Sequence, residues 1–277
     1  MKSPIDGGVV LITGASSGIG RAIAHTIGGR AKVQVLVARR RSLLEALATE
    51  LKARQPNLQV RVEECDLGDL AQVEAMLRRV QAEVGDPDVV INNAGFGDLG
   101  VYDLTDWSRT AQMIAVNVTA LAYLTRQVLP PMVQKGRGGV LQISSGFGLT
   151  FMPGGAAYIG SKHFVTGFSE ALRLELHGTG VRVTQVCPGP VATEFADNVG
   201  NFTGQSTPKW LEISATQCAQ AAIAGLDHDR AMVIPGTLIK LGIWAGMFSP
   251  RWLQRWMFAP LGAALRRKQL AAQPQSA

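Results

Sequence analysis

The stretch Val9-Val10-Leu11-Ile12-Thr13-Gly14-Ala15-Ser16-Ser17-Gly18-Ile19-Gly20 decides the fold of this chain. Its first four residues form a continuous apolar run, which is typical of a strand buried in a parallel sheet. The glycines that follow have the spacing GxxxGxG and lie where such a strand turns into a helix. Gly14 permits the tight turn, Gly18 lets a pyrophosphate approach the backbone, and Gly20 lets the helix pack closely. We therefore predict a phosphate-binding turn rather than a simple loop.

A second informative stretch is Tyr158-Ile159-Gly160-Ser161-Lys162. Residues four positions apart lie on one face of a helix, so Tyr158 and Lys162 project together. A neighbouring ammonium favours the phenolate and lowers the tyrosine pKa from its usual value of about 10. Such a pair can perform acid–base chemistry on an alcohol or ketone. Taken alone, it also fits a surface tyrosine packed on a lysine stem.

Apolar runs alternate with helical patterns along the chain, which predicts a parallel sheet covered by helices on both faces. Ser42-Leu43-Leu44-Glu45 fits a capping box that starts a helix to about Arg54, and Asp69 caps a helix to about Val84. Pro130-Pro131 marks a kink or an end in a long helical pattern. Seven strands are predicted, at Val9–Ile12, Val33–Val37, Gln59–Glu63, Val89–Ile91, Gly139–Ile143, Arg182–Val186 and Met232–Ile234.

The composition fits one globular α/β unit with a tail. Of the 277 residues, 47% are hydrophobic and 17% are charged, which excludes a disordered chain. The cysteines and histidines lack the spacing of disulfide frameworks or metal sites, so we assign no metal. The first residues have no apolar signal region, and no run reaches the ~18 apolar residues of a membrane span. These features favour the cytoplasm.

Four motifs follow one another in the chain: Thr13–Gly20, Asn92-Asn93-Ala94-Gly95, a serine thirteen residues before Tyr158, and Tyr158–Lys162. With them the chain, over roughly residues 6–236, resembles the short-chain dehydrogenase/reductase family. The resemblance implies a nicotinamide-dependent oxidoreductase with a Rossmann-like, doubly wound, seven-stranded parallel sheet in the order 3-2-1-4-5-6-7. It also implies a homodimer or homotetramer, and a catalytic set made of Asn117, Ser145, Tyr158 and Lys162.

The resemblance also assigns roles to these residues. Tyr158 transfers the substrate proton, while Lys162 lowers the tyrosine pKa and binds the nicotinamide ribose. Ser145 holds the substrate oxygen, and Asn117 supports a water leading to Lys162. Ser144 is a neighbouring candidate, but adjacent strand residues face opposite sides, and the thirteen-residue interval favours Ser145.

The predicted cofactor contacts lie beyond the carboxyl ends of the strands, where ligands bind in open α/β sheets. Asp66 resembles the family's adenine-contacting residue, although it could instead cap the following helix. The run Pro188–Thr193 resembles a family motif on the nicotinamide side, although a plain turn-rich loop would have the same composition. The predicted contacts are Gly14, Ser16, Ser17, Gly18, Ile19, Gly20, Arg39, Arg40, Asp66, Leu67, Asn93, Ala94, Gly95, Tyr158, Lys162, Pro188, Gly189, Val191 and Thr193.

The end of the second strand predicts NADP(H) rather than NAD(H). A carboxylate at this place binds a ribose 2'-hydroxyl, whereas an arginine accommodates a 2'-phosphate. Here the chain has Ala38 followed by Arg39 and Arg40, so a planar guanidinium is available. The arginines could also be a solvated helix start, but helix starts favour acids over bases.

The predicted substrate contacts are mostly apolar, which favours a hydrophobic ketone or secondary alcohol, such as a lipid-like, steroid-like or acyl-chain molecule. The alternative is that the aromatic residues only pack the core. These contacts are Ser145, Phe147, Phe151, Phe195, Phe202 and Trp210.

The chain divides into residues 1–236, which carry the motifs and a substrate loop at about 191–213, and a C-terminal extension at 237–277. No acid follows Asp229, and the aromatic-rich extension carries the cations Lys240, Arg251, Arg255, Arg266, Arg267 and Lys268. Such a basic amphipathic segment suits a lid over the substrate site or a subunit interface. It also suits contact with an anionic membrane surface. Nucleic-acid binding is not predicted, because no recognition fold accompanies these cations.

Two other functions share part of this pattern. A binding protein could sense NADP(H) without turnover, but it would not need Ser145, Tyr158 and Lys162 at these intervals. An epimerase or dehydratase could use the same tyrosine, but it would usually have a larger substrate domain. The sequence therefore favours the oxidoreductase.

Overall fold

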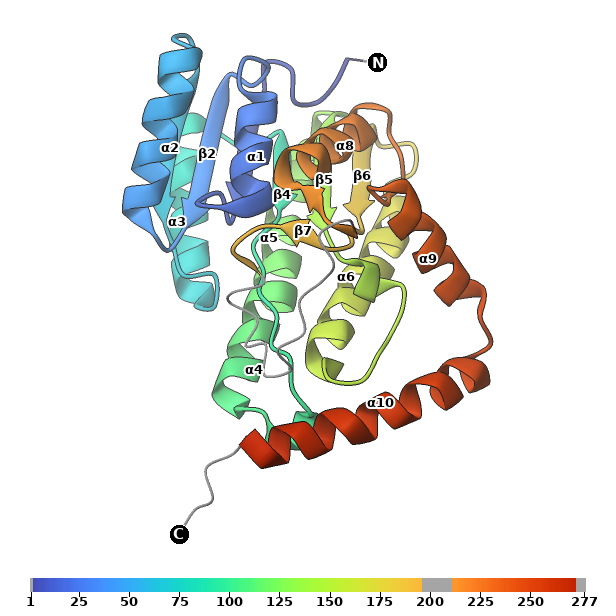
Figure 1. Ribbon diagram of the computed structural model, residues 1–277. Helices are drawn as coiled ribbons and strands as arrows, with labels where there is room; N and C mark the ends of the chain where they lie inside the picture. The colour runs from blue at the N-terminus through green and yellow to red at the C-terminus, as the bar shows by residue number, and fades with distance from the viewer. Residues whose placement is uncertain (1, 196–210, 273–277) are drawn as a thin grey trace.

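A seven-stranded parallel sheet forms the centre of the computed structural model, which describes residues 2–195 and 211–272 (Figure 1). Its strand order, β3-β2-β1-β4-β5-β6-β9, confirms the predicted doubly wound arrangement. The strands are β1 Val9–Thr13, β2 Val33–Ala38, β3 Gln59–Glu64, β4 Val89–Asn92, β5 Gly138–Ile143, β6 Val181–Val186 and β9 Met232–Val233.

Two apolar cores, one on each face, hold this sheet between helices. Side chains alternate along a strand, so Val10 and Ile12 of β1 belong to one core while Val9 and Leu11 belong to the other. The first core is covered by α1 (Gly18–Ile27), α2 (Arg41–Arg54) and α8 (Ala215–Asp227). The second is covered by α3 (Leu70–Val84), α5 (Leu121–Gln134) and α6 (Ala156–Glu175). All strand residues of β1, β2, β4 and β5 are buried, as continuous apolar runs predict.

The start of α2 corrects one prediction. The helix begins at Arg41, not after Ser42, and no side chain caps it. The reason is that Glu45, the acid of the supposed capping box, pairs instead with Arg41 at 2.8 Å. The predicted cap of α3 is confirmed, because Asp69 accepts hydrogen bonds from the N–H groups of Ala71 and Gln72.

Of the kink or helix end predicted at Pro130-Pro131, the end is wrong, because both prolines lie inside α5. Burial of Val128 and Met132 on either side of them keeps this turn against the core. The irregularity in this part of the chain comes earlier. Between α4 (Trp107–Ile114) and α5, residues Ala115–Ala120 form a π-helical segment, η2, of the kind often found at functional sites.

A small second sheet was not predicted. It pairs β7 (Val191–Ala192) with β8 (Ile213–Ser214), and two-residue strands are too short to give a periodic signal. Two short 3-10 turns, η1 (Tyr102–Leu104) and η3 (Gly146–Gly148), lie in loops after β4 and β5. The C-terminal segment forms α9 (Thr237–Phe248) and α10 (Arg251–Ala272), and α10 crosses below α4 and α6 in the view of Figure 1.

Both C-terminal helices contact the body of the protein. Ile243 of α9 is buried and lies against Gly146. Near the end of α10, the Gln269 side chain accepts a hydrogen bond from the Val101 N–H and donates to the Leu104 carbonyl. Arg266 pairs with Asp103 at 2.7 Å. Within residues 2–195 and 211–272, no helix is long and apolar enough to cross a membrane.

Candidate active site

The glycine turn after β1 is fastened to the end of β4. The Asn93 side chain donates hydrogen bonds to the carbonyls of Thr13 (2.9 Å) and Gly14 (3.2 Å). In return, the Thr13 hydroxyl accepts from the N–H groups of Asn93 and Ala94, both at 3.0 Å. These bonds bring the first two of the four family motifs to one edge of the sheet and fix the shape of the turn.

The turn needs glycine where the backbone approaches closely. Gly14 has a φ of +65°, and a Cβ there would lie 2.8 Å from the Asn93 side chain. A Cβ on Gly20 would collide with the Gly14 carbonyl, so α1 can pack this close only without a side chain there. The Ser17 side chain makes no capping bond to α1, which leaves the helix start suited to an anion. The turn therefore fits a dinucleotide pyrophosphate.

Arg40 reaches over this turn. Its guanidinium donates to the hydroxyls of Ser17 (2.9 Å) and Ser16 (3.3 Å), and it pairs with Glu194 at 3.1 Å. Arg39 is exposed beside it, and its contact with a cofactor stays a prediction. A guanidinium and two hydroxyls gathered at one point suit a phosphate group.

Asp66 does not cap α3, so that alternative is wrong. Its carboxylate accepts a hydrogen bond from the Gly68 N–H at 2.9 Å, while Asp69 serves as the cap. Leu67, next to it, is buried. The contact of Asp66 and Leu67 with adenine stays a prediction.

Tyr158 and Lys162 lie one turn apart on α6, and both are buried. The Lys162 Nζ lies 5.9 Å from the centre of the Tyr158 ring and donates to the Ile143 carbonyl at 3.0 Å. The Ser145 hydroxyl lies close enough to Tyr158 to act on its pKa. The neighbouring Ser144 faces the other way, toward the Lys162 carbonyl (3.2 Å) and the Thr166 hydroxyl. Of the two serines, Ser145 is the one beside the tyrosine.

The predicted lowering of the tyrosine pKa is wrong for the protein without ligands. Burial raises the pKa of Tyr158 to about 12, and the nearby Ser145 hydroxyl opposes this only in part. Burial also lowers the pKa of Lys162 to about 8, with the nearby Cys187 acting in the opposite direction. Desolvation therefore outweighs the attraction between the two side chains.

Asn117 lies in the π-helical segment η2 and is buried. Its side-chain oxygen accepts from the Phe96 N–H, and its nitrogen donates to the Phe96 carbonyl and the Ser161 hydroxyl. A Cβ on Gly95 would lie 2.9 Å from the Asn117 oxygen and 3.4 Å from the Lys162 Nζ. Asn117 and Lys162 thus approach the same point, which is open only because residue 95 is glycine.

The segment after β6 completes this edge. The Pro188 carbonyl accepts a hydrogen bond from the Gly146 N–H at 2.8 Å, which joins the segment to the loop carrying Ser145. Gly189 has no room for a side chain beside Ile239 of α9. Val191 pairs with Ile213, and Thr193 lies 3.2 Å from the position of a Cβ on Gly18. The glycine turn and this segment therefore face each other across a narrow space.

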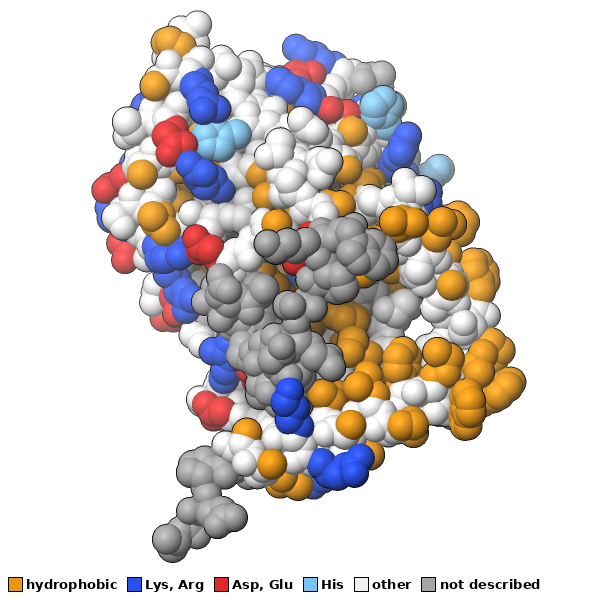
Figure 2. All heavy atoms as spheres, viewed as in Figure 1, with side chains coloured by type: hydrophobic (Ala, Val, Ile, Leu, Met, Phe, Trp, Pro, Cys, Tyr) orange, Lys and Arg blue, Asp and Glu red, His pale blue; other side chains and the backbone are white. Residues whose placement is uncertain are grey.

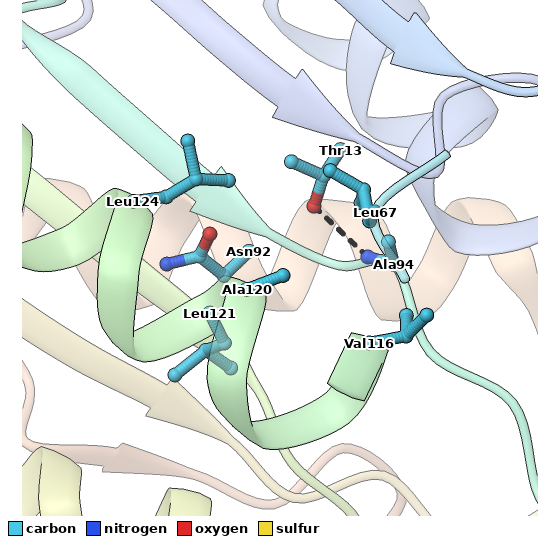
Figure 3. Close-up of a pocket in the computed structure, with 8 residues that line it drawn as sticks. All are labelled: Thr13, Leu67, Asn92, Ala94, Val116, Ala120, Leu121 and Leu124. Carbon is cyan, nitrogen blue, oxygen red and sulfur yellow. Dashed lines mark hydrogen bonds between the residues drawn. The ribbon is translucent and has the colours of Figure 1, made fainter. Parts of the chain in front are cut away.

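A small cavity lies under this edge, between the end of β4 and the start of α5 (Figure 3). Its volume of about 10 Å³ corresponds to roughly one water molecule, so it belongs to the core and not to a ligand site. Figure 3 shows Thr13 bonded to Ala94 at its side, with Leu67 and Asn92 in the wall. The remaining lining residues are Val116, Ala120, Leu121 and Leu124.

Two aromatic side chains lie near the Tyr158 ring. The rings of Phe147 and Phe195 lie 6.4 Å and 5.9 Å from the Tyr158 ring. Phe151 meets Phe258 of α10 at 6.5 Å. The other two predicted substrate contacts, Phe202 and Trp210, lie outside the described residues. The described aromatic residues thus form two groups, one around Tyr158 and one where Phe151 meets α10.

Sequence reasoning missed several residues of this site. Thr13 was treated only as part of the turn, although its hydroxyl holds the Asn93 loop. Glu194 comes from a distant segment, so no local signal pointed to it. Phe258 belongs to the aromatic-rich extension, for which a lid over the substrate site was one prediction. Ser161 could have been found, because it lies one turn after Tyr158 on the same helix. Within the described residues, no cluster of His, Cys, Asp or Glu could hold a metal ion.

The sheet is doubly wound, and its edge brings a glycine turn together with a serine, a tyrosine and a lysine. This combination is typical of a class of nicotinamide-dependent oxidoreductases. The sequence profile described as short chain dehydrogenase matches residues 8–203. The chain therefore belongs to the short-chain dehydrogenase/reductase family and is an NAD(P)-dependent oxidoreductase.

Individual relatives cover most of the chain. An NADP-dependent 3-hydroxy acid dehydrogenase from Schizosaccharomyces pombe is 35% identical over 251 residues, which is 86% of this chain and 93% of that protein. A short-chain dehydrogenase from Sphingobium yanoikuyae, solved in complex with NADPH, has a TM-score of 0.77 at 29% identity and covers 98% of this chain and 97% of its own. A bulky-bulky ketone specific alcohol dehydrogenase from Comamonas testosteroni has a TM-score of 0.72 at 26% identity, covering 98% and 96%.

Proposed function

We propose that this protein interconverts a hydrophobic ketone and its secondary alcohol with NADP(H). The observation that carries this proposal is the convergence of Ser145, Tyr158 and Lys162 at the edge where the glycine turn ends. A bound nicotinamide supplies or accepts the hydride. The chain's own residues must hold the substrate oxygen and move its proton.

Tyr158 is the residue placed to move that proton. Because burial raises its pKa to about 12, the phenol keeps its proton at neutral pH and can donate it to a ketone oxygen. Ser145, which lies beside Tyr158, would hold the substrate oxygen as a neutral donor. A protonated Tyr158 is therefore the form that ketone reduction requires.

Lys162 and Asn117 are proposed to assist proton transfer by Tyr158 without contacting the substrate. The Lys162 amine lies beside the ring, and its other neighbours are the Ile143 carbonyl and the space in front of Gly95. Asn117 faces the same space, which suits a water that relays protons to the amine. In this role Lys162 would act on the tyrosine only when the cofactor ribose is bound.

The proposed cofactor is NADP(H) rather than NAD(H). Arg40, Ser16 and Ser17 form a group suited to a 2'-phosphate, and Ala38 stands where a carboxylate would favour NAD(H). The Schizosaccharomyces pombe relative is NADP-dependent by name, and the Sphingobium yanoikuyae structure holds NADPH.

A hydrophobic substrate is supported by two aromatic groups, Phe147 and Phe195 beside Tyr158, and Phe151 with Phe258. The Comamonas testosteroni neighbour acts on bulky ketones, as its name states. We further propose that residues 1–236 form the oxidoreductase domain, with a substrate loop at about 191–213. The extension at 237–277 would cover the substrate side, and the protein would assemble as a homodimer or homotetramer.

The test is the decrease of NADPH absorbance with a panel of ketones graded from small to bulky and from polar to apolar. We expect turnover to be faster with bulky apolar ketones and faster with NADPH than with NADH. NADPH binding without turnover of any carbonyl would instead indicate a sensor. Product analysis with an activated sugar checks the epimerase or dehydratase alternative.

A further inference from the structure

The joint between α9 and α10 carries a dense group of exposed apolar side chains. Phe248 is 81% exposed, Trp256 73% and Trp252 69%. Figure 2 shows hydrophobic side chains continuing along α9 and the first part of α10 at the lower right edge of the molecule. We call this group the elbow patch. It consists of Leu238, Leu241, Trp244, Met247, Phe248, Trp252, Trp256 and Met257.

The joint has a fixed geometry. Gln254 is buried, and its side-chain nitrogen donates to the carbonyls of Gly246 (2.6 Å) and Ser249 (2.9 Å). The Ser249 N–H in turn donates to the Ala245 carbonyl at 3.1 Å. These bonds hold the end of α9 against the start of α10, so the exposure of the aromatic rings does not result from a loose segment.

The faces of α9 and α10 opposite the elbow patch pack against the body of the protein. Ile239 and Ile243 of α9 lie against Gly189 and Gly146 of the active-site loops. The far half of α10 is attached to residues 101–104 through Gln269 and Arg266. Because packing on the body uses these faces, the elbow patch is left pointing away from the body.

Cations lie among the exposed aromatic side chains. The Lys240 Nζ lies 5.2 Å from the centre of the Trp244 ring, and Arg251 and Arg255 are exposed beside the tryptophans of α10. None of these three cations forms an ion pair with a residue of the described chain, and no acid follows Asp229 in the sequence. If a second copy covered the patch, a symmetric contact would bring these like charges together. Anionic lipid headgroups would instead complement them.

We propose that the elbow patch docks on an anionic membrane surface. The aromatic rings would enter the boundary between headgroups and acyl chains, while Lys240, Arg251 and Arg255 contact phosphates. The helices would lie in the interface, since no described helix can cross a bilayer. Because Phe258 of α10 contacts Phe151, a proposed substrate contact, the substrate side would then lie near the lipid. Docking itself does not depend on the proposed reaction.

Vesicle binding tests this surface. The full-length protein is mixed with phosphatidylcholine vesicles with and without phosphatidylserine, and the partition coefficient is measured by sedimentation at low and high salt. We expect binding to the anionic vesicles that weakens as salt rises. The Arg251→Gln/Arg255→Gln variant should bind about 30-fold more weakly, from about 1 kcal/mol for each basic residue near the surface. Trp252→Ser/Trp256→Ser should bind at least about tenfold more weakly.

Matched controls separate the patch from general surface effects. Trp107→Ser removes a tryptophan that is 65% exposed on α4, and Arg78→Gln removes an exposed cation on α3. Both should bind vesicles like the wild type, and all variants should keep the wild-type circular dichroism spectrum. The proposal is overturned if the wild type does not bind anionic vesicles at low salt, or if the tryptophan variant binds equally well. It is also overturned if that variant lowers the oligomeric mass in light scattering without vesicles, because the patch would then be a subunit contact.

Discussion

The catalytic edge of the sheet and the elbow patch depart in opposite directions from the usual distribution of side chains. At the edge, a lysine, an asparagine and a tyrosine hydroxyl are buried; the lysine and the asparagine have hydrogen-bond partners, and Ser145 lies beside the tyrosine. At the elbow, tryptophan and phenylalanine rings are exposed. Buried polar groups and exposed apolar groups are both unfavourable unless something compensates them. We infer that the catalytic edge is suited to surround a small ligand and that the elbow patch is suited to contact a large surface.

The largest effect is expected at the catalytic edge, from Tyr158→Phe. Removing the hydroxyl takes away the proton donor but leaves the ring in place, so activity should fall about 10²- to 10⁴-fold. NADPH affinity, measured by fluorescence titration, should stay within a factor of about three, because the ring remains. Tyr123→Phe, which lies on α5 away from the site, is the matched control. Near wild-type turnover in Tyr158→Phe would remove the catalytic role of this edge.

The second test asks whether burial of a charge at this edge costs stability. Lys162→Met should abolish activity but raise the unfolding free energy at pH 7 by ~3 kcal/mol, since the folded pKa is about 8 and the ordinary value is 10.5. At a pH between these two pKa values, Lys162 is protonated to a larger extent in the unfolded chain than in the folded protein. Wild-type stability should therefore rise with pH through this window, and the variant should lack the rise.

Chemical denaturation at several pH values measures this effect. Lys32→Met, which removes an exposed lysine, should leave both stability and pH dependence unchanged. If Lys162→Met unfolds more easily than the wild type at pH 7, the lysine contributes more through its hydrogen bonds than its burial costs.

Arg40→Ala tests the nucleotide end of the same edge. Loss of a charged hydrogen-bond donor to a phosphate costs about 1.5–3 kcal/mol, so the NADPH dissociation constant should rise about 10- to 100-fold. The NADH constant should not change, because NADH has no 2'-phosphate. Arg41→Ala is the control, since Arg41 pairs with Glu45 on α2. Equal weakening of both cofactors by Arg40→Ala would contradict its role in discrimination.

The smallest effect is expected where α10 meets the body. Gln269→Ala removes one side chain that bonds both the Val101 N–H and the Leu104 carbonyl. We expect faster amide exchange in residues 251–272 and a KM for bulky ketones raised a few-fold, with kcat unchanged. Gln254→Ala, at the elbow, should raise exchange near residue 249 instead. If both variants loosen the same residues, the elbow and the docked end of α10 are not independent regions.

Sequence patterns predicted the sheet and the placement of the motifs well, because these depend on local chemistry. The run Val9–Ile12 and the glycine turn specify burial and backbone conformation within twelve residues, and the strand order follows the family resemblance. The failures arose where distant parts of the chain decide the outcome. Burial from surrounding elements raises the Tyr158 pKa, and the partner of Arg40 lies 154 positions away.

The end of α10 has a consequence for how the protein is made. Arg266 and Gln269 reach back to residues 101–104, which lie more than 160 positions earlier in the chain. During synthesis, the strands and helices of the nucleotide side leave the ribosome long before this helix does. In a nascent chain, the glycine turn after β1 can thus form while α10 is still being translated. A premature stop before residue 251 would leave a chain that contains all seven strands of the sheet but lacks α10.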